Sequence, residues 1–178
     1  MSQENQCNPA GFVDYVIKQV QDKNDTAFRA VMRRADNPNQ CSAAWEYLVP
    51  FCDLSKDYQR LSFALVGAAI ARKKPEKDGT QGLGAALRHI CKDDADVNRE
   101  ARRLRRLLAC NSALELIPVL RPIVQYIQSK DGTSIWYLQL LKDLLNWDSN
   151  PRERERTKIE WTRQYYHRQS IPAKTGEA

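Results

Sequence analysis

The chain has 178 residues, of which 42% are hydrophobic and 28% are charged. This is the composition of a globular protein, and it excludes the disordered and fibrous classes for the chain as a whole. The 28 lysines and arginines outnumber the 22 aspartates and glutamates, so the net charge of +6 favours a polyanionic or acidic partner.

The five cysteines predict neither a disulfide framework nor a metal site. Their number is odd, no two stand at CxxC spacing, and the histidines are only His89 and His167. Because residues 1–8 are polar and contain no hydrophobic leader, we expect a cytoplasmic protein with reduced thiols. The longest uncharged run, residues 61–71, is about half as long as a membrane span. We expect no membrane segment, metal, cofactor or small-molecule substrate.

Helical periods of apolar residues begin near the N-terminus, and no alternating strand pattern occurs along the chain. Pro9 begins a first helix, Asp25 can cap a second one, and Ser42 can cap a short third one. Ser55 is placed to cap a central helix that contains residues 61–71. Since that run is apolar on every side, we expect this helix to be buried all round.

A charged, turn-rich segment at residues 75–82 predicts a mobile loop. After it the pattern predicts a short helix at 83–91 and a helix from Asp96 to 110. Ser112 opens the next apolar stretch, whose helix is either kinked at Pro118 or begins at Pro118. Two further helices are predicted at 135–147 and 151–166. We therefore predict an all-α fold of about eight or nine helices in two helical-bundle lobes, at residues 1–78 and 79–168. Residues 169–178 are expected to form a disordered tail.

The helix after Asp96 separates apolar from basic side chains. At about 100° per residue, an apolar stripe forms in which Ala101, Leu104 and Leu108 fall within about 40° of Val97. Four arginines fall on the opposite face, Arg99, Arg102, Arg103 and Arg106, with Arg105 on the flank. Because like charges on one face repel one another, we interpret this face as a site for an anion. The alternative is an ordinary solvated face.

Other basic residues are candidates for the same nucleic-acid-binding surface, namely Arg33, Arg34, Arg121, Lys73, Lys74 and Arg88. Arg121 stands in an apolar helix, where it can either pair with a carboxylate or contact a ligand. At residues 152–156 (RERER) the charges alternate, which is typical of a salt-bridged exposed helix. The spacing of Trp161 and Tyr165 favours a core stripe over a base-stacking platform.

Nothing in the sequence predicts an enzyme. The glycine-rich piece GTQGLGAAL at residues 79–87 lacks the Gly-Lys-Ser/Thr ending of a phosphate-binding loop. No nucleophile elbow, pair of catalytic carboxylates or Cys–His arrangement occurs. We therefore expect no catalytic activity.

The order of the helical motifs resembles the CasB family, the small subunit of the type I-E CRISPR surveillance complex Cascade. The motifs are FRAVMRRADNP (28–38), AWEYLVPF (44–51), LVGAAIA (65–71), GLGAAL (82–87), REARRLRRLL (99–108), LRPIVQYI (120–127), IWYLQLLKDLLNW (135–147) and WTRQYY (161–166). None is diagnostic alone, and the resemblance rests on their order over nearly the whole chain.

This resemblance implies a non-catalytic subunit, present in two copies, that contacts the backbone subunits holding the guide RNA and helps to hold unwound target DNA. Such a subunit would stabilise the R-loop through contacts to phosphates. Family members commonly carry an arginine where Ala85 stands here, so that contact is not transferred, and Arg88 is included only as a displaced candidate. Two alternatives stay open: a helical protein–protein adaptor, and a helical DNA-binding regulator, for which no helix-turn-helix is evident.

Overall fold

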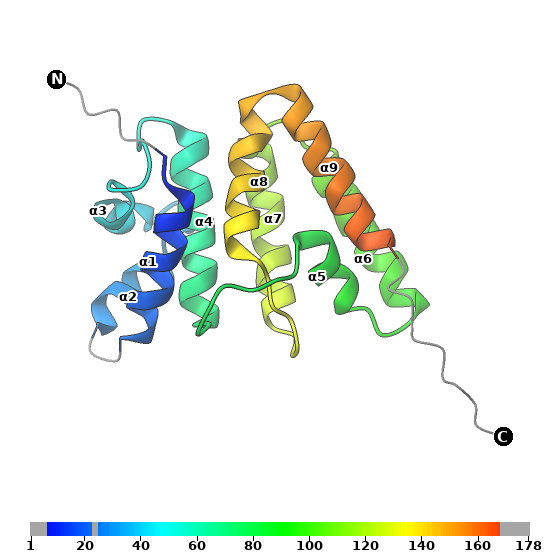
Figure 1. The fold of residues 1–178 in the computed structure, drawn as a ribbon, viewed down its shortest axis with the longest axis horizontal. Helices are drawn as coiled ribbons and strands as arrows, with labels where there is room; N and C mark the ends of the chain where they lie inside the picture. The colour runs from blue at the N-terminus through cyan, green and yellow to red at the C-terminus, as the bar shows by residue number, and fades with distance from the viewer. Residues whose placement is uncertain (1–6, 23–24, 168–178) are drawn as a thin grey trace.

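The computed structural model describes residues 7–22 and 25–167, and over these residues the fold is all-α, as the sequence predicts. The first half contains α1 (Pro9–Gln21), α2 (Thr26–Met32), a 3-10 helix (Cys41–Ala44), α3 (Trp45–Leu48) and α4 (Asp57–Lys73). The second half contains α5 (Leu83–His89), α6 (Asp94–Leu108), α7 (Ala113–Gln128), α8 (Tyr137–Ser149) and α9 (Pro151–Tyr166). In Figure 1, α1 to α3 lie on one side of α4, and α7 and α8 lie on the other.

Side-chain caps set the start of several helices where the sequence places them. Asp25 Oδ1 accepts a hydrogen bond from the Phe28 amide at 2.9 Å, and Ser112 Oγ accepts one from the Glu115 amide at 3.2 Å. The caps predicted at Ser42 and Ser55 are wrong. Ser42 lies inside the 3-10 helix, and the Ser55 hydroxyl donates to Asp53 Oδ1 at 2.7 Å. The start predicted at Asp96 is also late, since α6 begins at Asp94.

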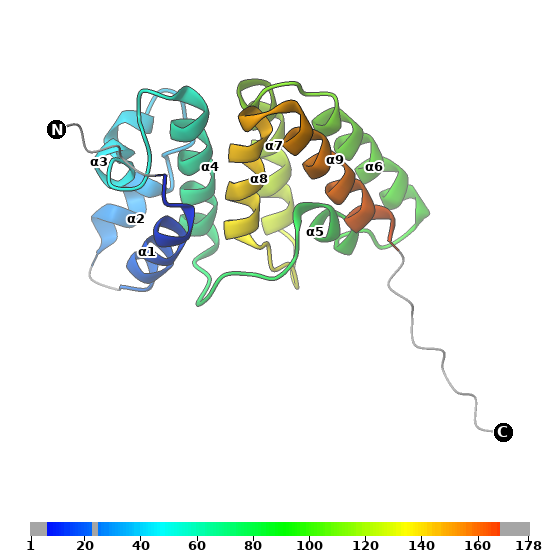
Figure 2. The ribbon, with the colours of Figure 1, turned by 45° about the horizontal axis from the view of Figure 1, so that its top comes forward.

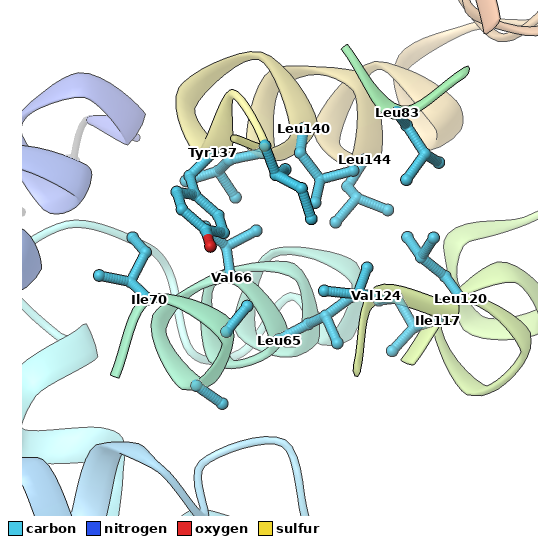
Figure 3. Packing of buried hydrophobic residues seen from close by; sticks show 14 of the residues in the cluster. Leu65, Val66, Ile70, Leu83, Ile117, Leu120, Val124, Tyr137, Leu140 and Leu144 are labelled. Atoms are coloured by element: carbon cyan, nitrogen blue, oxygen red, sulfur yellow. The ribbon is translucent and has the colours of Figure 1, made fainter. Parts of the chain in front are cut away.

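The central helix α4 is buried along nearly its whole length, as its uniformly apolar sequence predicts. On one side it packs against α1 and α2, and Gly67 permits that approach, because a Cβ there would overlap the Met32 sulfur and the Phe12 ring. On the other side its leucine and valine side chains meet those of α7 and α8 (Figure 3). The Gln128 amide ties the three helices together by donating to the Ala69 carbonyl at 2.7 Å and to the Tyr137 hydroxyl at 2.9 Å.

Helix α7 continues through both of its prolines, so of the two predicted alternatives the start at Pro118 is wrong. Pro118 and Pro122 are one turn apart, and both are exposed, as is Leu114 one turn earlier. Each proline removes the amide that would bond the carbonyl four residues before it. The carbonyls that lose their partners are those of Leu114 and Pro118. Because both residues lie on the exposed face of α7, water can hydrogen-bond to these two carbonyls.

Helix α9 packs closely on α5 and α8. Gly84 of α5 permits the approach, because a Cβ there would overlap the Trp161 carbonyl oxygen. Trp161 and Tyr165 are fully buried, which confirms the predicted core stripe. The Trp161 ring centroid lies 5.2 Å from that of Trp147, and the Trp161 indole donates to the buried Asp143 carboxylate at 2.6 Å.

The loop at residues 75–82 is fastened at its end rather than free. The Asp78 carboxylate accepts hydrogen bonds from the Tyr137 and Leu138 amides at 2.7 and 3.0 Å, so it caps the start of α8. Gln81 pairs with the strand-like residue Ile135 in an isolated bridge. These contacts join the beginning of α5 to the beginning of α8.

The division into lobes at residue 78 stays a prediction. A single cluster of buried hydrophobic side chains contains residues from both sides of that position, because α4 packs against α1 as well as against α7 and α8. The predicted tail at 169–178 lies outside the described residues. None of the described helices combines the length and the apolar composition that crossing a membrane requires.

Candidate nucleic-acid interface

Helix α6 carries the densest group of basic residues. The charges at its two ends are opposite in sign to the partial charges of the helix dipole. The Asp93 carboxylate caps the helix by accepting from the Asp96 amide at 2.8 Å, with Asp94 in the first turn. Arg105 and Arg106 occupy the last turn, where positive charge stabilises the helix. The helix therefore presents acidic residues at one end and basic residues at the other.

The buried stripe of α6 differs from the predicted one. It is formed by Glu100, Ala101, Leu104 and Leu107, whereas Val97 and Leu108 are only half-buried. At about 100° per residue, this places the buried face about 40° from the predicted direction. The shift brings Arg103 toward the protein and leaves Arg102 and Arg106 opposite the core.

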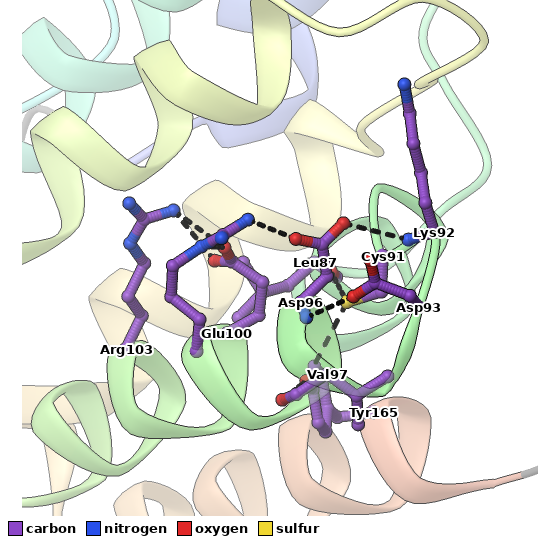
Figure 4. Close-up of polar contacts among 10 residues, drawn as sticks. Leu87, Cys91, Lys92, Asp93, Asp96, Val97, Glu100, Arg103 and Tyr165 are labelled. Atoms are coloured by element: carbon purple, nitrogen blue, oxygen red, sulfur yellow. Dashed lines mark hydrogen bonds and ion pairs between the residues drawn. The ribbon is translucent and has the colours of Figure 1, made fainter.

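Glu100 explains the shift, because it is a buried carboxylate with only 1% of its surface exposed. It pairs with Arg103 at 2.8 Å and with Arg99 at 3.2 Å (Figure 4). Arg99 also pairs with Asp96 at 2.5 Å, and its hydrogen bonds to the two carboxylates raise the pKa of the Arg99 guanidinium. A buried carboxylate needs such partners, so Arg99 and Arg103 are both paired with Glu100, although the side chain of Arg99 is half exposed.

The remaining three arginines of α6, Arg102, Arg105 and Arg106, form what we call the arginine face. All three are exposed, and within the part of the chain that the structure describes none of them pairs with a carboxylate. Their guanidinium groups are therefore available to an external anion. Arg105 belongs to this group, although the sequence placed it only on the flank.

A second basic group lies where α6 meets α7, around the half-buried ring of Tyr126. The Arg103 guanidinium carbon lies 4.2 Å from the ring centroid, and the Lys130 ammonium lies 4.8 Å from it. Cations at these distances are attracted to the electron-rich ring face. Sequence reasoning missed both Tyr126 and Lys130. Their spacing of four residues, with Tyr126 in the last turn of α7 and Lys130 just after the helix, was the signal that could have found them.

A third basic group lies between α2, α4 and α7. The Asp36 carboxylate, whose side chain is 3% exposed, pairs with Arg72 at 2.9 Å and with Arg121 at 3.5 Å. Arg121 therefore pairs with an internal carboxylate, one of the two roles predicted for it. Two guanidinium groups share a single carboxylate, and the Nε and Nη2 atoms of Arg72 are buried without a described hydrogen-bond partner. The group thus carries an excess positive charge that sequence reasoning, which assigned Arg72 no role, did not reveal.

The other predicted residues are distributed over the surface. Arg33 and Arg34 are exposed at the end of α2, which lies toward the opposite end of the long axis from α6 (Figure 1). Lys73 donates to the Gln128 carbonyl at 3.3 Å, and Lys74 ends α4 in a left-handed conformation with a φ of 52°. Arg88 is half-buried in the last turn of α5. The ten predicted residues therefore do not form one cluster.

The thiols and carboxylates offer no obvious alternative chemistry. Cys52 and Cys110 are buried, and burial raises the pKa of each thiol, to about 12 for Cys52. Among the residues that the structure describes, no group of three or more histidine, cysteine, aspartate or glutamate side chains is arranged to hold a metal ion. The prominent polar chemistry of this surface is that of its arginines.

Comparison with known proteins identifies the family. The sequence profile described as CRISPR-associated protein Cse2 matches residues 28–166. A Cse2-family CRISPR-associated protein of known structure from Thermus thermophilus is 26% identical, with a TM-score of 0.72 over 92% of this chain and 100% of that chain. A structure of CasB, also from Thermus thermophilus, is 24% identical, with a TM-score of 0.70 over the same shares.

A chain in a structure described as a CRISPR RNA-guided surveillance complex is 22% identical, with a TM-score of 0.69 over 89% of this chain and 91% of that chain. No curated protein sequence matches this chain. The matches confirm the resemblance to CasB that the order of the helical motifs indicates. Since the profile covers most of the chain, the chain belongs to the CRISPR-associated Cse2 family.

Proposed function

We propose that this chain is a non-catalytic subunit of a CRISPR surveillance complex of the Cascade type, and that it binds nucleic-acid phosphates without reading sequence. Family membership and the fold shared with a chain of an RNA-guided surveillance complex support the first part. The single observation that carries the second part is the arginine face. Arg102, Arg105 and Arg106 are exposed on one helix, and among the described residues no carboxylate pairs with them.

Contacts of this kind suit the energetics of RNA-guided recognition. Exchange of a DNA duplex for an RNA–DNA duplex is nearly balanced in free energy, so modest contacts to the strands can decide it. Arginine contacts to phosphates add free energy that does not depend on base identity. A subunit with an arginine face can therefore stabilise the unwound target DNA, or R-loop, while the guide RNA supplies the specificity.

The same proposal specifies partners and place. The partners are the target DNA, the guide RNA, the backbone and other subunits of Cascade and a second copy of this chain, all in the cytoplasm. Arg33, Arg34, Arg121, Lys73, Lys74 and Arg88 are further candidates for contacts to these strands. Arg99, Arg103 and Arg121 are weaker candidates than the sequence indicates, because Glu100 already binds the first two and Asp36 binds the third.

The test replaces Arg102 and Arg106 with alanine and measures binding of single-stranded and duplex oligonucleotides of unrelated sequences over a salt series. We expect weaker binding of all sequences to a similar degree. For each phosphate that the variant no longer binds, the slope of log affinity against log salt should flatten by about 0.7 on single strands and by about 0.9 on duplex DNA. Stability should change by less than about 0.5 kcal/mol, because both side chains are exposed.

The matched control is Arg152→Ala with Arg156→Ala, which removes the same charge from two exposed residues of α9. There Arg156 already pairs with Glu153 at 3.0 Å, so we expect a smaller change in the salt slope. Equal effects of the two double variants would show that only net charge matters. An unchanged slope in a folded Arg102→Ala, Arg106→Ala variant would contradict the proposed interface.

A further inference from the structure

A groove lies between α6 and α9, which run beside each other at the end of the molecule farthest from α2 (Figure 2). Its volume is about 700 Å³, within the range of specific binding pockets. Leu108 of α6 and Ile159 and Tyr166 of α9 provide its apolar lining. The groove belongs neither to the arginine face nor to the buried core.

The apolar lining is exposed to an unusual degree for residues that converge on one groove. Ile159 and Tyr166 are each 54% exposed, and they stand seven residues apart, on the side of α9 away from the buried Trp161. This gives an otherwise highly charged helix a second apolar stripe. The Tyr166 ring packs edge-on against Tyr165, with centroids 4.9 Å apart, so its position is supported from inside the protein. Apolar side chains gathered around a groove are typical of an interaction site.

The charges around this lining are mainly positive. Lys158 and Arg163 line the groove, and Arg105 stands one helical turn before Leu108 on the same side of α6. Arg163 also pairs with Glu160 at 3.6 Å, so Lys158 and Arg105 contribute most of the excess positive charge. The lining acid is Glu155. An occupant that combines apolar side chains with acidic ones would therefore match both the lining and its surroundings.

We propose that the groove between α6 and α9 docks an acidic amphipathic helix of a partner protein, with apolar anchors spaced three, four or seven residues apart. That spacing follows from a helix lying along α9, beside the end of α6 at Leu108, and placing successive side chains in the groove. A nucleic acid fits less well, because Tyr166 is the one phenylalanine, tyrosine or tryptophan among the lining residues that the structure describes, Leu108 and Ile159 beside it are aliphatic, and Glu155 repels phosphates. Arg105 of the arginine face borders the groove, but this inference does not depend on the nucleic-acid contacts proposed for Arg102 and Arg106.

The test uses the full chain and a small set of fluorescent synthetic helices of about 14 residues, with leucines at these spacings and glutamates elsewhere. We expect saturable binding to at least one of them, with amide NMR shifts centred on Ile159 and Tyr166. Ile159→Ser should weaken binding about tenfold, the order expected for one buried aliphatic side chain. The Arg102→Ala, Arg106→Ala variant should leave it within about twofold.

Several outcomes would overturn the inference. They are no saturable binding below about 1 mM, equal binding of the same helices with lysine in place of glutamate, and shifts located elsewhere. If Ile159→Ser instead weakens oligonucleotide binding, the groove belongs to the nucleic-acid surface. If it abolishes a concentration-dependent dimer, the occupant is a second copy. If deletion of residues 168–178 is needed before any helix binds, the occupant is this chain's own C-terminus.

Discussion

Replacing Asp143 with asparagine should change how the stability of the protein depends on pH. The Asp143 side chain is buried where α8 meets α9, and its carboxylate accepts hydrogen bonds from the Trp161 indole at 2.6 Å and the Gln139 amide at 2.8 Å. Burial raises the pKa of Asp143 to about 6, and the neighbouring Glu160 carboxylate adds to the rise. The two hydrogen bonds oppose the rise, since they stabilise the ionised form.

The sign follows from comparing the folded and unfolded chains. An unfolded aspartate has a pKa of about 3.9, so Asp143 loses its proton more readily when the chain unfolds. Its contribution to the free energy of unfolding is fully present below about pH 4 and is lost as the pH rises to about 6. A difference of about two pKa units corresponds to about 3 kcal/mol.

The assay is urea-induced unfolding, followed by tryptophan fluorescence, of the wild type and of Asp143→Asn between pH 4 and pH 7.5. Asparagine keeps an oxygen that can accept from Trp161 and stays neutral throughout. Other titrating groups cancel in the difference between the two proteins. As the pH rises over this range, the free energy of unfolding of the variant should therefore increase by about 3 kcal/mol relative to that of the wild type. A difference that does not vary with pH would refute the reasoning.

Two further substitutions test the packing around α6 and α9. Glu100→Gln should lower the free energy of unfolding at pH 7 by about 1–3 kcal/mol, because Arg103 loses its carboxylate partner beside Tyr126. An unchanged urea midpoint would show that this ion pair adds nothing. Gly84→Ala should cost more than about 2 kcal/mol, since the added Cβ overlaps the Trp161 carbonyl. The neighbouring Ala85→Gly should cost only the helix propensity, about 1 kcal/mol, and equal losses in the two variants would contradict the close approach of α5 and α9.

In two of the basic groups an internal carboxylate pairs with the arginines, which makes these arginines less available to bind phosphates. Glu100 and Asp36 each bind two guanidinium groups, so Arg99, Arg103 and Arg121 already have partners in the folded chain. A phosphate approaching them would have to compete with a nearly fully buried carboxylate. For this reason the substitutions that best test nucleic-acid binding are those at residues with no described carboxylate partner.

Local signals predicted most of the fold. Asp25, Ser112 and Pro151 stand where helices begin, because a cap or a first-turn proline acts on amides within three or four residues. The helix caps predicted at Ser42 and Ser55 were wrong, also for local reasons. Ser55 turned its hydroxyl to Asp53, an alternative partner two residues away that the apolar period cannot reveal.

The orientation of α6 was less predictable, because its apolar residues are few. A buried, salt-bridged glutamate can lie on the same helix face as the apolar residues. The periodicity of apolar residues does not reveal it. Once Glu100 is inside, the helix is turned so that Leu107 replaces Leu108 in the core and Arg103 approaches Tyr126. Asp143 is a similar case on α8, where a single charged residue in LLKDLLNW is buried against Trp161 of the next helix.

The all-α class, the positions of the helices and the family could all be predicted from the order of the residues, since caps, apolar periods and motif order depend on neighbours along the chain. The order of the residues could not predict which arginines remain available to an anion. The carboxylate that binds Arg72 and Arg121 belongs to Asp36, in the turn after α2 and distant from both arginines in the sequence, and the ring beside Arg103 comes from α7. Charge pairing acts through space, so a positive residue in the sequence becomes a candidate binding residue only where the fold brings no carboxylate to it.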